Sequence, residues 1–243
     1  MESKAWFEEW FDSPYYPILY KHRDDCEAEL FINNLVSKLK LRSGARVLDM
    51  ACGRGRHSLY LNKKGFDVAG MDLSEHSIAE AKKKENETLN FYVHDMRKPF
   101  SVNYFDAIFN LFTSFGYFDN DKENRQVVGS VQQALKKDGL FILDFMNVTK
   151  VIANLVATEE KTVEGIRFKI ARGLKDGKVV KDISFDDKGK HFHFSECVRA
   201  LTRHDLREYF ERCKLSIVHE WGDYELNDYD EKKSDRLILV GKK

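Results

Sequence analysis

The stretch that decides the fold reads VLDMACGRGRH and runs from Val47 to His57. It opens with an apolar run typical of a buried parallel strand, which is covered on both faces. Gly53 and Gly55 then make a turn, and a predicted helix from Arg56 to Lys64 follows, ended by Gly65. Glycines at such a turn let the backbone approach a ligand, and the helix start offers unpaired N–H groups and a positive dipole end. The stretch therefore predicts a cradle for a small molecule.

Three kinds of ligand bind to a strand, glycine turn and helix of this kind. A phosphate-binding P-loop needs a Gly-Lys-Ser/Thr ending, and Arg56 and His57 after Gly55 exclude that motif. A dinucleotide fingerprint needs a third glycine where Ser58 lies, so a pyrophosphate site is disfavoured without being excluded. The third candidate is S-adenosylmethionine, whose carboxylate is smaller than a pyrophosphate and demands less of the turn.

Acidic residues after two further predicted strands favour the third candidate. The second strand, Phe66 to Met71, is followed by Asp72, which can accept hydrogen bonds from both hydroxyls of a ribose. The third strand, Leu89 to His94, is followed by Asp95 and Met96, which suit the edge and the face of an adenine.

These motifs, in this order, resemble those of class I S-adenosylmethionine-dependent methyltransferases. The matching residues are Val47-Leu48-Asp49 with Cys52, Gly53 and Gly55, then Gly70 to Ser74, then His94-Asp95-Met96. The resemblance covers residues 45 to 146 most closely, and each motif follows a strand. It implies an α/β fold with a Rossmann-like, seven-stranded, mostly parallel sheet, helices on both faces and a closing antiparallel hairpin.

The resemblance also implies a set of cofactor-binding residues. Gly53 and Gly55 are expected to line the methionyl part, with Asp49 ordering the turn or meeting the amine. Asp72 is expected to hold the ribose, and Asp95 to bind the exocyclic amine of the adenine. The full set is Tyr20, Asp49, Cys52, Gly53, Arg54, Gly55, His57, Asp72, Leu73, Asp95, Met96 and Asn110.

The resemblance also implies roles for other members of that set. Leu73 and Met96 would flank the adenine, and Asn110 would place a backbone carbonyl near the methionyl amine. His57 would bind the cofactor's carboxylate or pack beneath the turn. Tyr20 belongs to an N-terminal segment that folds over the cofactor in this family. No proline follows Asn110, which counts against methylation of nucleic-acid bases or of protein glutamine.

The chain divides into a core and two additions. Residues 1–44 are expected to form a helical cap, with helices from Ala5 to Phe11 and from Asp24 to Lys40. Residues 45–158 and 202–243 would form the core, and residues 159–201 an antiparallel β insert of about three strands that covers the active site. Asp176-Gly177 is a strong hairpin signal within that insert.

Further elements are expected in the second half of the core. A helix from Asn124 should end at Asp138-Gly139, before a strand from Leu140 to Met146. Thr202 should cap a helix from Arg203 to Arg212, and two closing strands should follow.

Substrate contacts are expected from the additions and from the loop after the fourth strand. The expected residues are Tyr16, Tyr117, Phe118 and Arg199. In the insert, alternating residues from His191 to Arg199 form a face that is either solvated or turned to the substrate. His191 and His193 could hold a metal, but no third ligand is evident, so no metal site is expected. No side chain is assigned a catalytic role.

The composition limits the binding partners and the cellular location that can be expected. Lys+Arg and Asp+Glu are balanced at 40 each, so no net charge attracts nucleic acid or an anionic membrane. The four cysteines are scattered, which suits reduced thiols in the cytoplasm. The N-terminus lacks the pattern of a signal peptide, and no apolar run reaches the ~20 residues of a membrane span. The oligomeric state stays open.

The favoured function is methyl transfer from S-adenosylmethionine to a small molecule, with an amine acceptor slightly preferred to an oxygen. The sulfonium makes the methyl carbon electrophilic, so the protein must mainly orient the acceptor and exclude water. Two alternatives remain open from the sequence: an NAD-linked Rossmann oxidoreductase and a non-catalytic S-adenosylmethionine-binding module.

Overall fold

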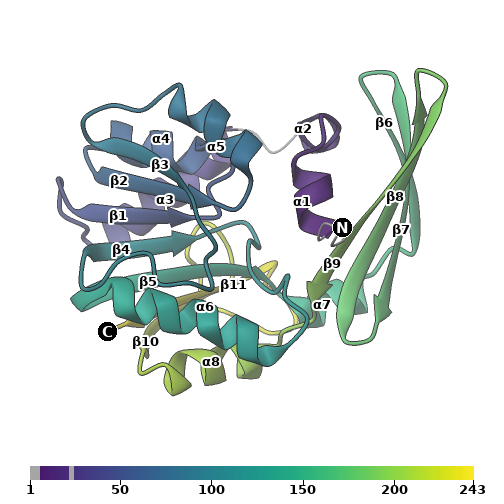
Figure 1. Ribbon diagram of the computed structural model, residues 1–243. Coiled ribbons are helices and arrows are strands. Elements are labelled where there is room, and N and C mark those ends of the chain that lie inside the picture. The colour runs from purple at the N-terminus through teal and green to yellow at the C-terminus, as the bar shows by residue number, and fades with distance from the viewer. Residues whose placement is uncertain (1–5, 22–24) are drawn as a thin grey trace.

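The computed structural model describes residues 6–21 and 25–243, in which a seven-stranded and a four-stranded sheet form (Figure 1). The strands of the larger sheet are β1 (Arg46–Met50), β2 (Asp67–Asp72), β3 (Leu89–Val93), β4 (Phe105–Asn110), β5 (Leu135–Met146), β10 (Ser216–Trp221) and β11 (Arg236–Lys242). The smaller sheet contains β6 (Thr158–Val163), β7 (Ile166–Lys175), β8 (Lys178–Asp187) and β9 (Lys190–Arg199). The helices are α1 (Trp6–Phe11), α2 (Tyr16–Leu19), α3 (Asp25–Lys38), α4 (Arg56–Lys63), α5 (Glu75–Lys82), α6 (Asp121–Ala134), α7 (Val148–Ala153) and α8 (Arg203–Arg212). Ala5 and Asp24, where two expected helices begin, lie outside the described residues.

The larger sheet has the order β10-β11-β5-β4-β1-β2-β3, and β11 runs antiparallel to both of its neighbours. The chain moves outward from β1 to β3 and then returns to place β4 on the other side of β1. Such a reversal opens a crevice at the carboxyl ends of the strands, where α/β proteins bind ligands. The expected seven-stranded, mostly parallel fold is confirmed.

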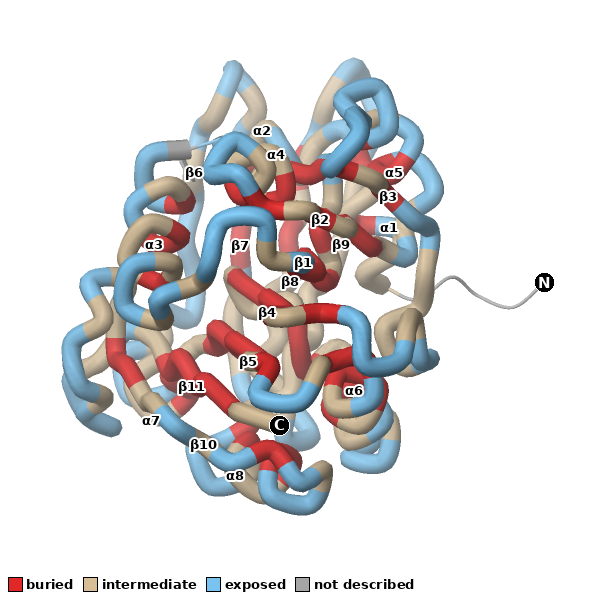
Figure 2. Tube along the Cα trace, turned by 90° about the vertical axis from the view of Figure 1, so that its left-hand side faces the viewer, coloured by how far each residue is buried: buried red, intermediate tan, exposed pale blue. Residues whose placement is uncertain are grey.

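Helices cover both faces of this sheet because successive strand residues point to opposite sides. On one face Val47 packs with Phe31 of α3 and Leu61 of α4. On the other face Leu48 packs with Val127 of α6 and Phe210 of α8. In Figure 2 the central strands β4, β5 and β11 are buried, and the outer sides of the helices are exposed.

The insert has four strands, where the sequence pattern indicated about three. The additional strand is β6, which pairs antiparallel with β7 from Thr158↔Ala171 to Val163↔Ile166. Half of its residues, TEEKTV, are charged and most are exposed at the sheet edge, so no apolar alternation marks it. The expected hairpin at Asp176-Gly177 is confirmed, with positive φ angles of 49° and 71°.

The two N-terminal helices lie between the two sheets (Figure 1). Trp10 of α1 and Leu19 of α2 are buried with Phe168, Ile183 and Phe185 of the insert. This third cluster is separate from the two cores of the larger sheet, so the cap and the insert share one apolar interior.

The boundary between α6 and β5 differs from expectation. The helix ends at Ala134, and β5 begins at Leu135, so the helix end expected at Asp138-Gly139 is wrong. Asp138 has a φ of 66°, and the pairing with β4 shifts register beside it. The turn residues therefore form an irregularity within a strand. Thr202 does cap α8, in a capping box with Asp205.

Candidate active site

A cavity of about 630 Å³ lies at the carboxyl ends of β1, β2 and β4, and the N-terminal helices and the insert complete its wall. The expected residues that line it are Tyr16, Tyr20, Asp49, Cys52, Gly53, Arg54, His57, Asp72, Leu73, Asp95, Met96, Tyr117 and Phe118. Gly55, Asn110 and Arg199 do not line it. We call the part around Asp49, Gly53, Asp72 and Asp95 the motif end. The part around Phe11, Tyr16, Val179, Glu196 and Val198 is the insert end.

The glycine turn uses its two glycines for different reasons. Gly53 has a φ of 54° and open space where a side chain would start. Gly55 has a φ of 81°, and a Cβ there would lie 2.6 Å from the ring of Phe91. Gly55 is therefore required for packing of the turn against β3. It does not line the cavity, where contact with the ligand was expected.

Asp72 joins the turn to the end of β2. Its Oδ2 accepts a 2.8 Å hydrogen bond from the amide of Gly53, and its Oδ1 accepts one of 2.9 Å from the amide of Ser74. Burial raises the pKa of this carboxyl. Because each carboxylate oxygen has two acceptor positions, both oxygens can still accept from a ligand.

Asp49 is fully buried beneath the same turn. The hydroxyl of Ser58 donates a 2.5 Å hydrogen bond to its Oδ2. Burial raises the pKa of Asp49 to about 7. Ser58 occupies the position of the third glycine in a dinucleotide fingerprint, so the departure from that motif supplies a partner for this acid.

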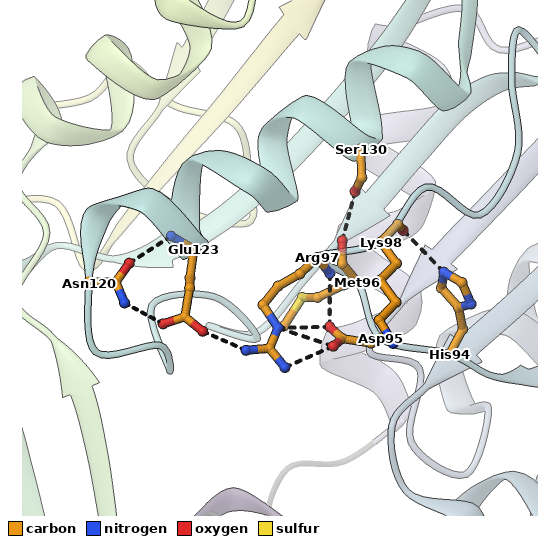
Figure 3. A network of polar contacts seen from close by, with 8 residues as sticks. All are labelled: His94, Asp95, Met96, Arg97, Lys98, Asn120, Glu123 and Ser130. Atoms are coloured by element: carbon orange, nitrogen blue, oxygen red, sulfur yellow. Dashed lines mark hydrogen bonds and ion pairs between the residues drawn. The ribbon is translucent and has the colours of Figure 1, made fainter.

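Asp95 is held by a residue that the motif reading did not include. Figure 3 shows Arg97 contacting both carboxylate oxygens, with Nη2 at 2.8 Å from Oδ2 and Nε at 3.1 Å from Oδ1. Arg97 Nη1 also donates to Oε1 of Glu123 at 2.6 Å. Burial alone would raise the pKa of Asp95, but the bonds from Arg97 hold it below its ordinary value. Asp95 is thus fixed in place as an ionised acceptor.

The segment after β4 is strained at the edge of the cavity. Phe112 and Thr113 have φ angles of 57° and 62°, which bulky and β-branched residues rarely adopt. The ring of Phe112 stacks on His57 with centroids 4.9 Å apart. Burial, together with the nearby Arg56, lowers the pKa of His57 to about 3, so its imidazole is neutral.

Asn110 supports this segment from below. Its Nδ2 donates to the carbonyl of Ser114 at 3.1 Å and, more weakly, to that of Met50 at 3.4 Å. Its Oδ1 is buried, and no described residue donates to it. The side chain therefore links two strand ends without reaching the cavity wall.

The insert end is lined by aromatic rings and one carboxylate. Glu196 of β9 accepts hydrogen bonds from Trp10 Nε1 at 2.7 Å and from the hydroxyl of Tyr20 at 2.5 Å. Its other oxygen lies 3.7 Å from Lys181 of β8, which also bonds to Tyr20. The rings of Phe11 and Tyr16 contact each other, with centroids 5.0 Å apart.

The structure decides between the two possible orientations of the β9 face and corrects the substrate contact expected for Arg199. The β9 side chains in the cavity wall are Glu196 and Val198, while those of His191 and His193 are 66% and 59% exposed. The face from His191 to Arg199 is thus turned away from the cavity. Arg199 forms an ion pair with Asp121 at 2.9 Å and donates to the carbonyl of Asp119 at 3.0 Å.

Several wall residues were not anticipated from the sequence. They include Phe7, Phe11, Met146, Val179, Glu196 and Arg236. No local motif marks them, because each reaches the cavity from an element distant in the chain. The alternation along β9 did indicate two candidate faces, and choosing between them required the position of α1.

Comparisons with known proteins agree with the geometry of this cavity. A family model described as a methyltransferase domain matches residues 47–139. The glycine/sarcosine N-methyltransferase of Aphanothece halophytica is 32% identical over 238 residues, covering 91% of this chain and 83% of that protein. A dTDP-3-amino-3,4,6-trideoxy-alpha-D-glucopyranose N,N-dimethyltransferase of Streptomyces venezuelae is 28% identical over 183 residues, covering 68% of this chain and 77% of its own length.

The fold has a solved counterpart. The crystal structure of an S-adenosylmethionine-dependent methyltransferase from Clostridium acetobutylicum superposes with a TM-score of 0.80 at 21% identity, covering 94% of this chain and 95% of that one. The oxidoreductase and the non-catalytic module are not supported by these similarities. The chain belongs to the class I S-adenosylmethionine-dependent methyltransferases and is an enzyme with S-adenosylmethionine as its cofactor.

Proposed function

We propose that this enzyme methylates an amine nitrogen of a small molecule bound at the insert end of the cavity. The similarity to an enzyme named for glycine and sarcosine, and to one named for an amino sugar, supports both parts of the proposal. The observation that carries it is the cavity itself, which joins the motif end to a second, aromatic-lined space.

The residues of the motif end fit the cofactor. Open space beside Gly53 admits the methionyl part, and Asp72 offers two oxygens to the ribose hydroxyls. Asp95, held ionised by Arg97, offers an acceptor to the adenine amine. The volume of about 630 Å³ lies within the range of small-molecule sites and leaves room for an acceptor beside a nucleoside.

When bound, S-adenosylmethionine supplies a methyl carbon made electrophilic by its sulfonium. The protein then has to orient the nitrogen and exclude water, which can contribute several kcal/mol to rate acceleration. Phe11, Tyr16 and Tyr117 close the wall over this space. Aromatic faces also attract a cation, by roughly 0.5–2 kcal/mol each.

An amine acceptor is consistent with the weak basicity of the side chains around the acceptor space. His57, with its pKa near 3, is a weak base at neutral pH. Oε1 of Glu196 is already occupied by Trp10 and Tyr20. A neutral amine needs no base during methyl transfer, because its lone pair forms the N–C bond as the S–C bond breaks, and the proton leaves afterwards to water. A hydroxyl would need a stronger base.

The domain boundaries and the location are part of the same proposal. Residues 1–44 would act as the cap, 159–201 as the insert that covers the site, and 45–158 with 202–243 as the core. We expect a cytoplasmic enzyme without nucleic-acid partners. No described helix combines the length and the apolar character needed to span a membrane.

The test is transfer of labelled methyl groups from S-adenosylmethionine to glycine, to sarcosine and to compounds of a metabolite extract. We expect label in a small molecule, attached to nitrogen, as shown by mass spectrometry of the product. Label attached to oxygen or carbon would overturn the amine assignment. Label found only in protein or nucleic acid would overturn the small-molecule assignment.

A further inference from the structure

Arg236, the first residue of β11, lines the cavity with a guanidinium that is only partly used by the protein. Its Nε donates to Oδ1 of Asp144 at 2.7 Å, and its Nη2 donates to the hydroxyl of Thr113 at 2.8 Å. No described residue accepts a hydrogen bond from Nη1. The guanidinium has five N–H donors, so those on Nη1 remain for another partner.

The protein partner of this guanidinium, Asp144, accepts hydrogen bonds at both carboxylate oxygens. Oδ2 of Asp144 accepts from the amide of Phe112 at 2.7 Å and from the hydroxyl of Tyr224 at 3.3 Å. The Asp144 side chain is fully buried, while that of Arg236 is 19% exposed. Asp144 therefore holds the guanidinium on one side. Arg236 lines the cavity, and its Nη1 group is left for a partner there. Nη1 is not among the buried polar atoms that lack a partner, so its donors are open to the cavity and can meet an acceptor there.

The chemistry of the ligand follows from the shape and charge of this group. The planar fork of a guanidinium matches a planar carboxylate. A phosphate dianion fits less well, because the negative Asp144 lies directly behind the guanidinium at 2.7 Å. A singly charged carboxylate is the acceptor that this setting favours.

The position in the sheet identifies the source of the carboxylate. Arg236 pairs with Met146 of β5, so it lies at the carboxyl end of that strand. In the order β11-β5-β4-β1, the glycine turn after β1 is three strands away, or about 14 Å at the usual strand spacing. The methionyl part of the cofactor is expected at that turn, so its own carboxylate is the less favoured source.

We propose that Arg236 binds a carboxylate of the methyl acceptor, which makes the acceptor an amine that also carries a carboxylate. This inference rests on the proposed function, because it names the substrate class of the same cavity. Arg236 would position the acceptor, and Thr113 and Asp144 would keep the guanidinium in place.

The first experiment compares Arg236→Met and Arg236→Lys with the natural enzyme. A matched control is Arg46→Met, since Arg46 begins β1 at the opposite edge of the sheet and outside this cavity. Calorimetric titration measures the affinity for two ligands. S-adenosylhomocysteine has the methionyl carboxylate, and 5′-methylthioadenosine lacks it. We expect both affinities to stay within twofold in all variants.

The second experiment labels the acceptor with methyl groups from S-adenosylmethionine in a metabolite extract. Carbodiimide coupling to an amine tag then reports whether the labelled product has a carboxylate. We expect the product to take the tag. We expect Arg236→Met to lower kcat/KM for it about 10- to 100-fold, the usual loss for a hydrogen bond to a charged group, mainly through KM. Arg236→Lys should lose less, because it keeps the charge, and it replaces Arg236→Met if that variant does not fold.

The outcomes separate this inference from the proposed function. A labelled product without a carboxylate, or unchanged kcat/KM in both variants, overturns the assignment to the acceptor. Weaker binding of S-adenosylhomocysteine alone in Arg236→Met supports the carboxylate site and assigns it to the cofactor. Absence of any labelled small molecule counts against the proposed function. Since the inference names the acceptor of that function, it is overturned in that case as well, whatever the titrations show.

Discussion

The two ends of the cavity handle charge in opposite ways. At the motif end, the buried carboxyls of Asp49 and Asp72 have raised pKa values, because burial outweighs their hydrogen bonds. At the insert end, Glu196 lies beside Lys181 and accepts hydrogen bonds from Trp10 and Tyr20. No described residue forms an ion pair with Asp49 or Asp72, so a bound ligand can provide their positive charge, whereas Glu196 at the insert end already has Lys181 beside it.

This difference suits the two ligands. S-adenosylmethionine brings a sulfonium and an amine, so its binding can compensate the acids of the motif end. The insert end has to hold a neutral amine nitrogen, and around that nitrogen it needs shape and exclusion of water more than charge. The comparison predicts that substitutions at the motif end change cofactor affinity, while those at the insert end change acceptor kinetics.

The largest expected effect concerns Asp49, through the pH dependence of stability. Its pKa is raised in the folded protein, from an ordinary 3.8 to about 7, so the folded state binds this proton more tightly than the unfolded state. The stabilisation is complete below pH 4 and is lost as the pH rises towards 7, by at most roughly 4 kcal/mol. Asp49→Asn should lack this loss.

The measurement is the free energy of unfolding of both proteins by urea between pH 4 and 8, without cofactor. Taking the difference between them removes the contribution of the other carboxyls. The natural protein should lose stability relative to Asp49→Asn as the pH rises. Its affinity for S-adenosylmethionine should increase over the same range, because the ionised acid favours the cation. A difference that stays constant with pH would show that Asp49 is ionised in the free protein.

The next effect concerns Asp72 and cofactor affinity. Asp72→Ala should weaken binding of S-adenosylmethionine about 100-fold, because two charge-assisted hydrogen bonds to the ribose are lost. Asp67→Ala is the matched control, since Asp67 begins the same strand and its side chain is 41% exposed at the other edge of the sheet. Calorimetry should find normal affinity for the control. Equal affinities for both variants would remove Asp72 from the cofactor site.

The same contrast explains which parts could be predicted from sequence. Asp49, Gly53 and Asp72 each lie at or just after the carboxyl end of a strand, within a short, local motif, so the pattern indicated both their position and their neighbours. Trp10 and Glu196 are 186 residues apart, and their contact depends on how the cap meets the insert. No periodicity encodes such a meeting. Arg236 was missed for the same reason, since Thr113 lies 123 residues earlier.

The smallest effect tests the insert end through Tyr20. Tyr20→Phe keeps the ring in the cavity wall but removes the hydroxyl that bonds to Glu196 and Lys181. If this network positions the cap over the acceptor, KM for the acceptor should rise about 3- to 10-fold, the ordinary net value of one hydrogen bond, because the hydroxyl acts through the cap and does not bind the acceptor. The affinity for S-adenosylhomocysteine should stay within twofold.

Tyr15→Phe is the control for this last substitution. The hydroxyl of Tyr15 also links the cap to the insert, through Asp187 at 2.9 Å, but Tyr15 does not line the cavity. A rise in KM confined to Tyr20→Phe would place the effect at the cavity wall. Equal changes in both variants would mean that any loosening of the cap disturbs the acceptor. A loss of cofactor affinity in Tyr20→Phe would instead support contact of Tyr20 with the methionyl part, and the division between the two ends would then fail at this residue.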